Sequence, residues 1–330
     1  MEIGVVEGVR GGVVEARHRV HAVVVDAAGA VLASAGDPEL DCLLRSAAKP
    51  LQALPSLRDG VVARYDLEAR HVAVACGSHE GTPAHAAAVA DLVARAGLSL
   101  ADLRPRGVHP PLAADAARAL ALAGRVPTVL EHNCSGNHAL MLLREAMLGR
   151  DPGAYLDARG PAQEDATAAV ALACDREPGV AGDRCGMRAY SLPLRNAALG
   201  YLRLAGDGMP EPYAEAARGV AKAMREAPEM VAGPGSFDSL ANALGHVVAK
   251  RGALGVFCCA SAETGRGGAL KIEDGGFEAM EIAALGLLEA VAGPVGGQFD
   301  PWRGRPIRDG DGAQVGEWRS AFVLSSVLAL

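Results

Sequence analysis

Aromatic residues are scarce in this sequence, and lysine is scarcer still. Phe, Trp and Tyr make up 4% of the 330 residues, although half of all residues are hydrophobic. A sizeable core is therefore expected, and Ala, Val and Leu must build it. Against 28 Arg there are only four lysines, Lys49, Lys222, Lys250 and Lys271. Because lysine can lose its proton inside a site and arginine effectively cannot, each of these lysines is of interest.

A basic surface, a membrane span and a signal peptide are also missing. The net charge is −7 and the pI is about 5.7, whereas a nucleic-acid-binding protein usually presents a basic face. No apolar run approaches the roughly 20 residues that cross a bilayer, and the first residues lack a charged-then-apolar signal pattern. The seven cysteines are an odd number. We therefore predict a cytoplasmic protein with reduced cysteines, no nucleic-acid partner and no membrane association.

The order of the predicted elements indicates an α+β fold. Strands are predicted in the Val-rich first 36 residues and at 253–262, 267–275 and 317–326. The segment "HVAVACGSH" (71–79) is expected to be a buried strand that ends in a turn. Helices are predicted between these strands, at 82–97, 112–123, 136–148, 160–174, 193–205, 211–226, 236–250 and 277–293. We predict one domain over 1–330, with a mainly antiparallel sheet built from both chain ends and packed with helices.

The segment "RSAAKP" places Ser46 three residues before Lys49. A serine hydroxyl becomes a nucleophile when a base takes its proton, and a desolvated lysine can be that base. Residues three apart share a face of a helical turn, although Pro50 steers the preceding residue away from the α region. The segment is thus either a catalytic Ser–Lys pair or an exposed helix start.

A second polar turn, "CGSHEG" (76–81), follows an apolar segment. Active-site residues are often presented on such turns. Ser78, His79 and Glu80 could therefore bind a substrate or relay protons. The alternative is an ordinary loop.

Cys134 lies in "EHNCSGNHAL", between Asn133 and Ser135. Gly136 begins a predicted helix, and the backbone N–H groups of a helix start suit an anion or an oxyanion. His138 is the nearest base for Cys134, but four residues along the helix it can face away from the turn. Cys134 can be a nucleophile, a metal ligand or a buried thiol.

Two further segments carry residues of interest. Asp183 and Cys185 in "GDRCGM" would form half of a zinc site with Cys134, although the Cys-x-x-Cys spacing is missing. Lys271 in "GGALKIEDGG" either extends to the surface or projects into a site, as the strand lysine of penicillin-binding enzymes does.

Six segments, taken together and in this order, resemble the asparaginase II family of inducible rhizobial L-asparaginases. They are "RSAAKPLQALP", "ACGSHEGTPAHAAAV", "HNCSGNHALML", "DRCGMRAYSLPL", "MVAGPGSFDS" and "GGALKIEDG". The resemblance implies hydrolysis of L-asparagine to L-aspartate and ammonia. It also implies a homodimer and a fold related to serine β-lactamases and class A glutaminases.

The resemblance assigns roles to single residues. The family uses two Ser–Lys pairs, which match Ser46 with Lys49 and Ser78 with Lys271. Ser46 is then the expected nucleophile and Ser78 the expected proton relay, with the opposite assignment open. The expected substrate-binding residues are Arg45, His79, Asn133, Ser135, Gly136 and Asp183.

The family also carries a zinc ion held by two cysteines and a lysine. Cys134 and Cys185 match the cysteines, but Asn137 stands in place of the lysine. An amide is a poor zinc ligand, so we expect a weakly held zinc, helped by Asp183, or none. Two other functions stay open: another serine amidohydrolase acting on glutamine or a similar small amide, and a non-catalytic metal- or ligand-binding relative.

Overall fold

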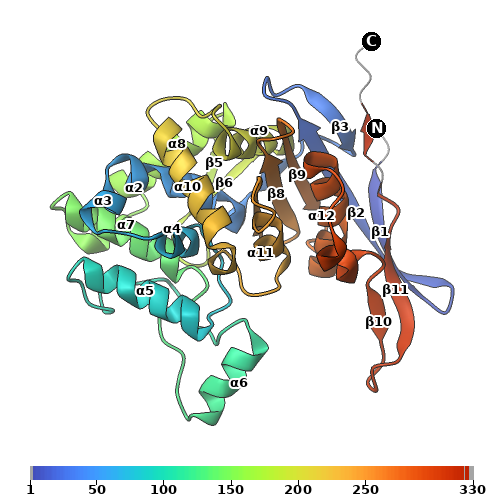
Figure 1. Ribbon diagram of the computed structural model, residues 1–330, viewed down its shortest axis with the longest axis horizontal. Coiled ribbons are helices and arrows are strands. Elements are labelled where there is room, and N and C mark those ends of the chain that lie inside the picture. Colours follow the sequence, from blue (N-terminus) through green and yellow to red (C-terminus); the bar gives the residue numbers. More distant parts are fainter. Residues whose placement is uncertain (1–2, 323, 327–330) are drawn as a thin grey trace.

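A computed structural model describes residues 3–322 and 324–326 of the chain. A nine-stranded sheet runs through the molecule, and helices cover it on both sides (Figure 1). Its strands are β1 (Gly4–Arg10), β2 (Val13–Val25), β3 (Val31–Ala35), β7 (Val247–Gly252), β8 (Val256–Ser261), β9 (Arg266–Ile272), β10 (Pro306–Arg308), β11 (Gln314–Ser320) and β12 (Ser325–Ser326).

Every strand pair in this sheet is antiparallel. The strand order is β10-β11-β1-β2-β9-β8-β7, with β3 beside β2 and β12 beside β3. The N-terminal strands β1 and β2 thus pair with the late strands β11 and β9. This confirms the predicted α+β fold with both chain ends in one antiparallel sheet. Residue 323, inside the predicted last strand, lies outside the described residues.

The helices that fill the middle of the chain lie mainly on one side of the sheet (Figure 1). They are α1 (Lys49–Gln52), α2 (Leu54–Arg58), α3 (Val61–Arg64), α4 (Ala69–Cys76), α5 (Pro83–Arg95), α6 (Ala114–Leu122), α7 (Ser135–Met147), α8 (Pro161–Cys174), α9 (Leu194–Ala205), α10 (Ala214–Glu226) and α11 (Phe237–Asn242). The late helix α12 (Phe277–Ala292) packs against β8, β9 and β2.

Short elements complete the chain. A small antiparallel sheet has the order β4-β6-β5. Its strands are β4 (Asp41–Leu43), β5 (Gly179–Gly182) and β6 (Arg188–Pro193), and the single 3₁₀ turns are η1 (Arg45–Ala48), η2 (Pro152–Leu156), η3 (Pro228–Met230) and η4 (Gly297–Trp302). Within the described part of the chain, no helix is long and apolar enough to cross a membrane.

Alternate residues of the central strands point into two hydrophobic cores. On β8, Cys258 and Ala260 belong to the core that contains α9, while Phe257 and Cys259 belong to the core that contains α12. Side chains of a strand alternate between the faces of its sheet. Because helices cover both faces, the strand is apolar throughout, which explains the uninterrupted run "VFCCA".

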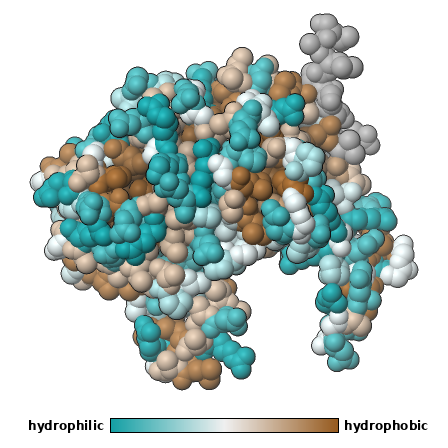
Figure 2. Space-filling view, viewed as in Figure 1, coloured by the Kyte–Doolittle hydropathy of each residue, from teal (hydrophilic) through white to brown (hydrophobic). Residues whose placement is uncertain are grey.

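Helix α6 projects from the body of the molecule, and so do β10 and β11 (Figure 1). The tip beyond α6 carries an apolar surface (Figure 2), where Leu122 and Val126 are more than three-quarters exposed.

Capping residues place helix α5 as predicted. Thr82 is its N-cap, Pro83 stands in the first turn, and Gly97 follows the helix with a positive φ. The predicted helices 160–174 and 193–205 match α8 and α9 to within one residue.

The predicted strand at 71–79 is wrong, because this segment forms most of helix α4. Length and apolar character do not distinguish a short buried strand from a buried helix. The decisive signal is a cap: the backbone N–H of Glu68 donates to Nδ1 of His71 over 2.9 Å, and the Glu68 side chain accepts from the same turn. Ser78 therefore follows a helix.

The predicted helix at 236–250 is correct only for its first half. Helix α11 ends at Asn242, and strand β7 begins at Val247. The Asn242 side chain donates to the carbonyl of Ala249 over 2.8 Å and accepts from its N–H over 3.2 Å, which ties the helix end to the strand. Lys250 therefore lies on a sheet strand.

Gly136 belongs to a helix crossing, and its expected role in substrate binding stays a prediction. Helix α7 packs against α4 here, and a Cβ atom at Gly136 would lie 2.3 Å from the carbonyl oxygen of Val74. No side chain fits at that distance, so Gly136 allows the close approach of the two helices.

Replacing Gly136 with Ala should therefore lower the free energy of unfolding by about 3 kcal/mol, because the helices must separate. Gly182→Ala is the matched control, since nothing lies within 4 Å of a Cβ atom there. Chemical denaturation of both variants measures the difference. Equal stabilities would contradict the packing role of Gly136.

Candidate active site

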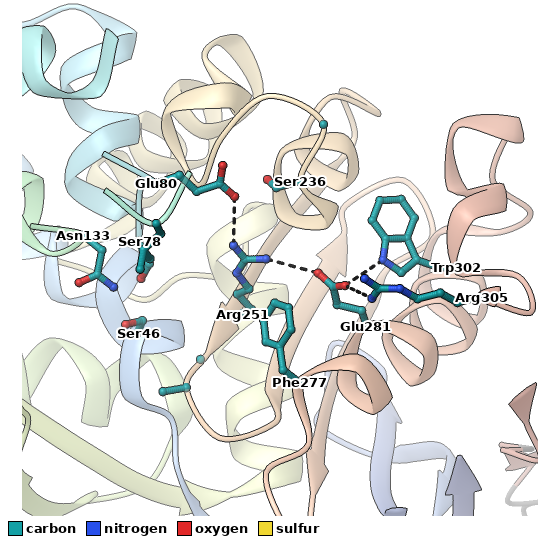
Figure 3. Close-up of a pocket in the computed structure, with 14 residues that line it drawn as sticks. Ser46, Ser78, Glu80, Asn133, Ser236, Arg251, Phe277, Glu281, Trp302 and Arg305 are labelled. Atoms are coloured by element: carbon teal, nitrogen blue, oxygen red, sulfur yellow. Dashed lines mark hydrogen bonds and ion pairs between the residues drawn. The ribbon is translucent and has the colours of Figure 1, made fainter. Parts of the chain in front are cut away.

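Ser46 and Ser78 line the same cavity, of about 550 Å³. The cavity lies between η1, the end strand β7 and helix α12, and Figure 3 shows both serines at one end of it. Asn133 also lines it, as expected for a substrate-binding residue. The structure thus gathers three of the predicted site residues, from segments almost 90 positions apart.

Ser46 is presented by a tight turn. Arg45 before it has a φ of +50°, in the left-handed region that non-glycine residues rarely adopt. The turn is held from outside, since the Leu44 N–H donates to the Tyr190 carbonyl over 2.8 Å and the Tyr201 hydroxyl donates to the Ala47 carbonyl over 2.6 Å. Ser46 stays partly exposed to the cavity.

Lys49 is buried and joins the segments that carry the serines. Its Nζ donates to the Gly77 carbonyl over 2.7 Å, to the Ser78 hydroxyl over 3.2 Å and to the Asn133 carbonyl over 3.4 Å. A base can exchange a proton with a hydroxyl at such a distance. Lys49 therefore forms the Ser–Lys contact of this cavity, with Ser78.

Lys271 does not lie at Ser78, which corrects the predicted second pair. Its Nζ donates to the backbone carbonyls of Leu254 over 2.8 Å and Glu273 over 3.4 Å, and also contacts the carbonyl of Ile272. It lines a separate cavity together with Leu43 and Asp274. The glycines before Lys271 resemble those near a catalytic strand lysine. In the structure, however, the Lys271 side chain hydrogen-bonds to backbone carbonyls in the turns at the end of β9.

Lys250 is the buried lysine that the sequence reasoning passed over. Its Nζ donates to Oδ2 of Asp238 over 3.2 Å and to the Arg251 carbonyl over 2.8 Å. Burial lowers its pKa to about 8, against the opposing effect of Asp238, and Arg251 and Lys49 lower it further. The scarcity of lysine in the sequence marked Lys250 as a residue of interest, but the predicted helix at 236–250 placed it on the wrong element.

Arg45 and Asp183 bind each other. Two guanidinium nitrogens of Arg45 donate to the two carboxylate oxygens of Asp183, over 2.9 and 3.1 Å. The hydrogen bonds from this arrangement raise the pKa of Arg45. Such a bidentate pair is strong and geometrically specific. It lines an adjoining cavity, of about 440 Å³, that shares Ser46 and Asn133 with the first.

His79 and Ser135 lie behind the cavity, not in it. Both are fully buried, and neither lines the cavity of the serines. His79 Nδ1 accepts from the Gly81 N–H over 3.2 Å, so Nε2 carries the proton and donates to the Ser135 hydroxyl over 2.9 Å. Burial lowers the pKa of His79 well below its usual value. The pair holds the turn after Ser78, the structure does not bring it to the cavity wall, and its expected substrate contact stays a prediction.

Comparison with known families now identifies the chain. The sequence profile of L-asparaginase II matches residues 6–320. The chain belongs to the L-asparaginase II family. The predicted family is confirmed.

Solved structures resemble this family member only distantly. Native Mglu in 4.3 M NaCl has 14% identity over 84% of this chain and 63% of its own, with a TM-score of 0.48. A second native Mglu structure has 14% identity over 78% and 59%, with a TM-score of 0.44. A beta-lactamase from Mycobacterium bovis has 15% identity over 79% and 89%, with a TM-score of 0.30.

These likenesses are too remote to indicate an activity. The chain spans about three fifths of the length of the Mglu chains that it matches. Comparison with curated protein sequences finds no significant match.

In this L-asparaginase II family member, the His138 side chain is not placed to act as a base for Cys134. His138 shares a hydrogen bond of 3.0 Å with the Tyr155 hydroxyl, and burial lowers its pKa to about 3. The Cys134 thiol donates to Oδ1 of Asn133 over 3.5 Å, and the neighbouring thiol of Cys185 lowers the pKa of Cys134 well below its usual value. Both thiols are buried. Cys134 is therefore a supporting thiol beside the cavity.

The donors around these thiols do not fit the family's zinc site. Asn137 stands where the lysine is expected, and its buried Nδ2 has no hydrogen-bond partner among the described residues. Asp183 is already held by Arg45. In the part of the chain that the structure describes, three metal-binding side chains come together only at Glu68, His71 and Asp91, which also pair with arginines. No catalytic step is assigned to a metal.

Purified protein should accordingly retain well under one zinc ion per chain after dialysis against a chelator. Asn137→Lys should raise the retained zinc towards one, because it restores an amine beside two thiols. Asn137→Met, of similar length but without a hard donor, is the control. Elemental analysis gives the ratio, and a wild-type protein that keeps a full equivalent would contradict this.

Proposed function

We propose that the chain hydrolyses L-asparagine to L-aspartate and ammonia. The observation that supports this most directly is the buried Lys49, 3.2 Å from the Ser78 hydroxyl and beside a cavity that Ser46 also lines. Membership of the L-asparaginase II family supports the same reaction. A serine, a lysine and a second serine supply a nucleophile, a base and a proton relay.

Ser46 is the proposed nucleophile because it is the accessible serine. It faces the cavity from a turn and is partly exposed, whereas Ser78 is buried and hydrogen-bonded to Lys49. Ser46 Oγ forms a bond to the side-chain amide carbon while the amine of Lys49 accepts the hydroxyl proton. The C–N bond then breaks, and Ser78 passes a proton from Lys49 to the leaving ammonia. Water hydrolyses the resulting ester and frees Ser46.

We propose that Lys250, in place of the expected Lys271, supports the site by tuning the charge around Lys49. Burial lowers the pKa of Lys250 to about 8, and Lys49 contributes to the lowering. A single catalytic domain, a homodimer and a cytoplasmic location stay predictions.

The wild-type chain should release ammonia from L-asparagine, and Lys49→Arg should reduce the rate at least 100-fold. Arginine keeps the charge and the length but cannot act as a base at neutral pH. Lys222→Arg is the matched control, because Lys222 is exposed and, among the residues that the structure describes, pairs only with Glu226. A coupled ammonia assay with L-asparagine and L-glutamine measures all three chains. An active Lys49→Arg enzyme would remove the base role.

A slowly hydrolysed substrate should leave its acyl group on Ser46. Peptide mapping by mass spectrometry locates the label, and Ser46→Ala should abolish it. Ser78→Ala should slow turnover while Ser46 is still labelled. A label on Ser78 alone would reverse the assignment of the two serines.

A further inference from the structure

Arg251 stands in the middle of the serine cavity with most of its hydrogen-bonding capacity unused. Figure 3 shows it between the serines and Glu281. Among the described residues its guanidinium contacts Glu281 at 3.4 Å, Glu80 at 3.6 Å and Asp238 at 4.0 Å. A guanidinium has five N–H donors, and contacts of 3.6 Å or longer are not hydrogen bonds.

Arg45 is the cation that the sequence led us to expect at the substrate. Unlike Arg251, it already donates to a close carboxylate. Asp183 meets it through two hydrogen bonds of 2.9 and 3.1 Å, in the bidentate geometry that a substrate carboxylate would need. To bind an anion, Arg45 would first have to give up this partner. Arg251 loses no strong contact when it binds one.

Glu80 offers the opposite charge on the same cavity. Its backbone is fixed on both sides, since its N–H donates to the Ala232 carbonyl over 2.8 Å and its carbonyl accepts from Ala113 over 3.0 Å. Its carboxylate lies against Gly233, where a Cβ atom would be 2.2 Å from Oε2. Its only ion pair among the described residues is the 3.6 Å contact with Arg251.

Glu281 holds Arg251 from the far side and is itself satisfied. It accepts from Arg305 over 3.0 Å and from Trp302 Nε1 over 3.1 Å. Glu281 would therefore keep two hydrogen-bonding partners if Arg251 turned towards a ligand. The loosely paired charges that face the serines are Glu80 and Arg251 (Figure 3).

We propose that Arg251 and Glu80 bind the amino-acid end of the substrate, with Arg251 on the α-carboxylate and Glu80 on the α-ammonium group. The proposal rests on the proposed amide hydrolysis and names the residues that recognise the α-amino acid group. A zwitterion that meets both residues replaces one long ion pair with two short ones and leaves the net charge unchanged. Amides with a blocked amino or carboxyl group lose one of these contacts.

Binding of three ligands to a Ser46→Ala chain tests this without turnover. The ligands are L-asparagine, 3-aminopropanamide, which lacks the α-carboxylate, and succinamate, which lacks the α-amino group. In this Ser46→Ala chain, the additional substitution Arg251→Gln should weaken the binding of L-asparagine and succinamate about 10- to 100-fold. It should leave the binding of 3-aminopropanamide unchanged. The additional substitution Glu80→Gln should weaken the binding of L-asparagine and 3-aminopropanamide and leave the binding of succinamate unchanged. Ligand-observed NMR titrations give the dissociation constants.

Two further variants separate recognition from folding. Gly233→Ala pushes the Glu80 carboxylate aside and should reproduce the ligand pattern of Glu80→Gln. Arg251→Lys keeps the charge in the cavity but not the forked donors, and should weaken L-asparagine less than Arg251→Gln does. Thermal unfolding checks that each variant is folded.

Three results would overturn the proposal. One is an equal loss for all three ligands in Arg251→Gln, which would mean a structural role. Another is a carboxylate-dependent loss in Arg45→Gln and none in Arg251→Gln. The third is no binding of L-asparagine at all. Failure of the wild-type chain to release ammonia would refute the proposed function alone, because binding is measured separately.

Discussion

The site depends on the buried amino group of Lys49. Its Nζ donates to the carbonyls of Gly77 and Asn133 and to the hydroxyl of Ser78, and these acceptors come from two segments far from Lys49 in the sequence. A buried polar group is tolerated when such partners replace its water. The turn of Ser46, the end of α4 and the start of α7 are therefore held in one arrangement, and the removal of any acceptor would leave the amino group less satisfied.

Around Lys49, two arginine–carboxylate pairs differ in the distance between their charged groups. Arg45 and Asp183 meet through two short hydrogen bonds, whereas Arg251 and Glu80 stay 3.6 Å apart. The first pair is suited to hold the turn of Ser46, and the second is suited to open for a ligand. The distinction is one of distance and geometry, since each pair joins an arginine to a carboxylate. It also explains why residue types alone pointed first to Arg45.

Much of the fold could be predicted because local chemistry and tertiary structure agree. Thr82 and Pro83 begin α5 as predicted, and the Val-rich ends pair in one sheet. Predictions failed where an apolar pattern suits two structures. The segment of α4 is short and buried, and the capping box at Glu68 marks the start of a helix there. Likewise α11 stops at Asn242, because its side chain bonds to a strand seven residues later.

The sequence by itself determined the family and the α+β class, since ordered motifs and strand patterns are local in the chain. Only the tertiary structure decided which lysine meets Ser78, because that contact joins residues 29 positions apart. It also buries His79, Ser135 and Gly136 in the packing and brings Arg251, next to the buried Lys250, to the cavity. Burial and distance are properties of the folded chain, and no spacing along the sequence contains them.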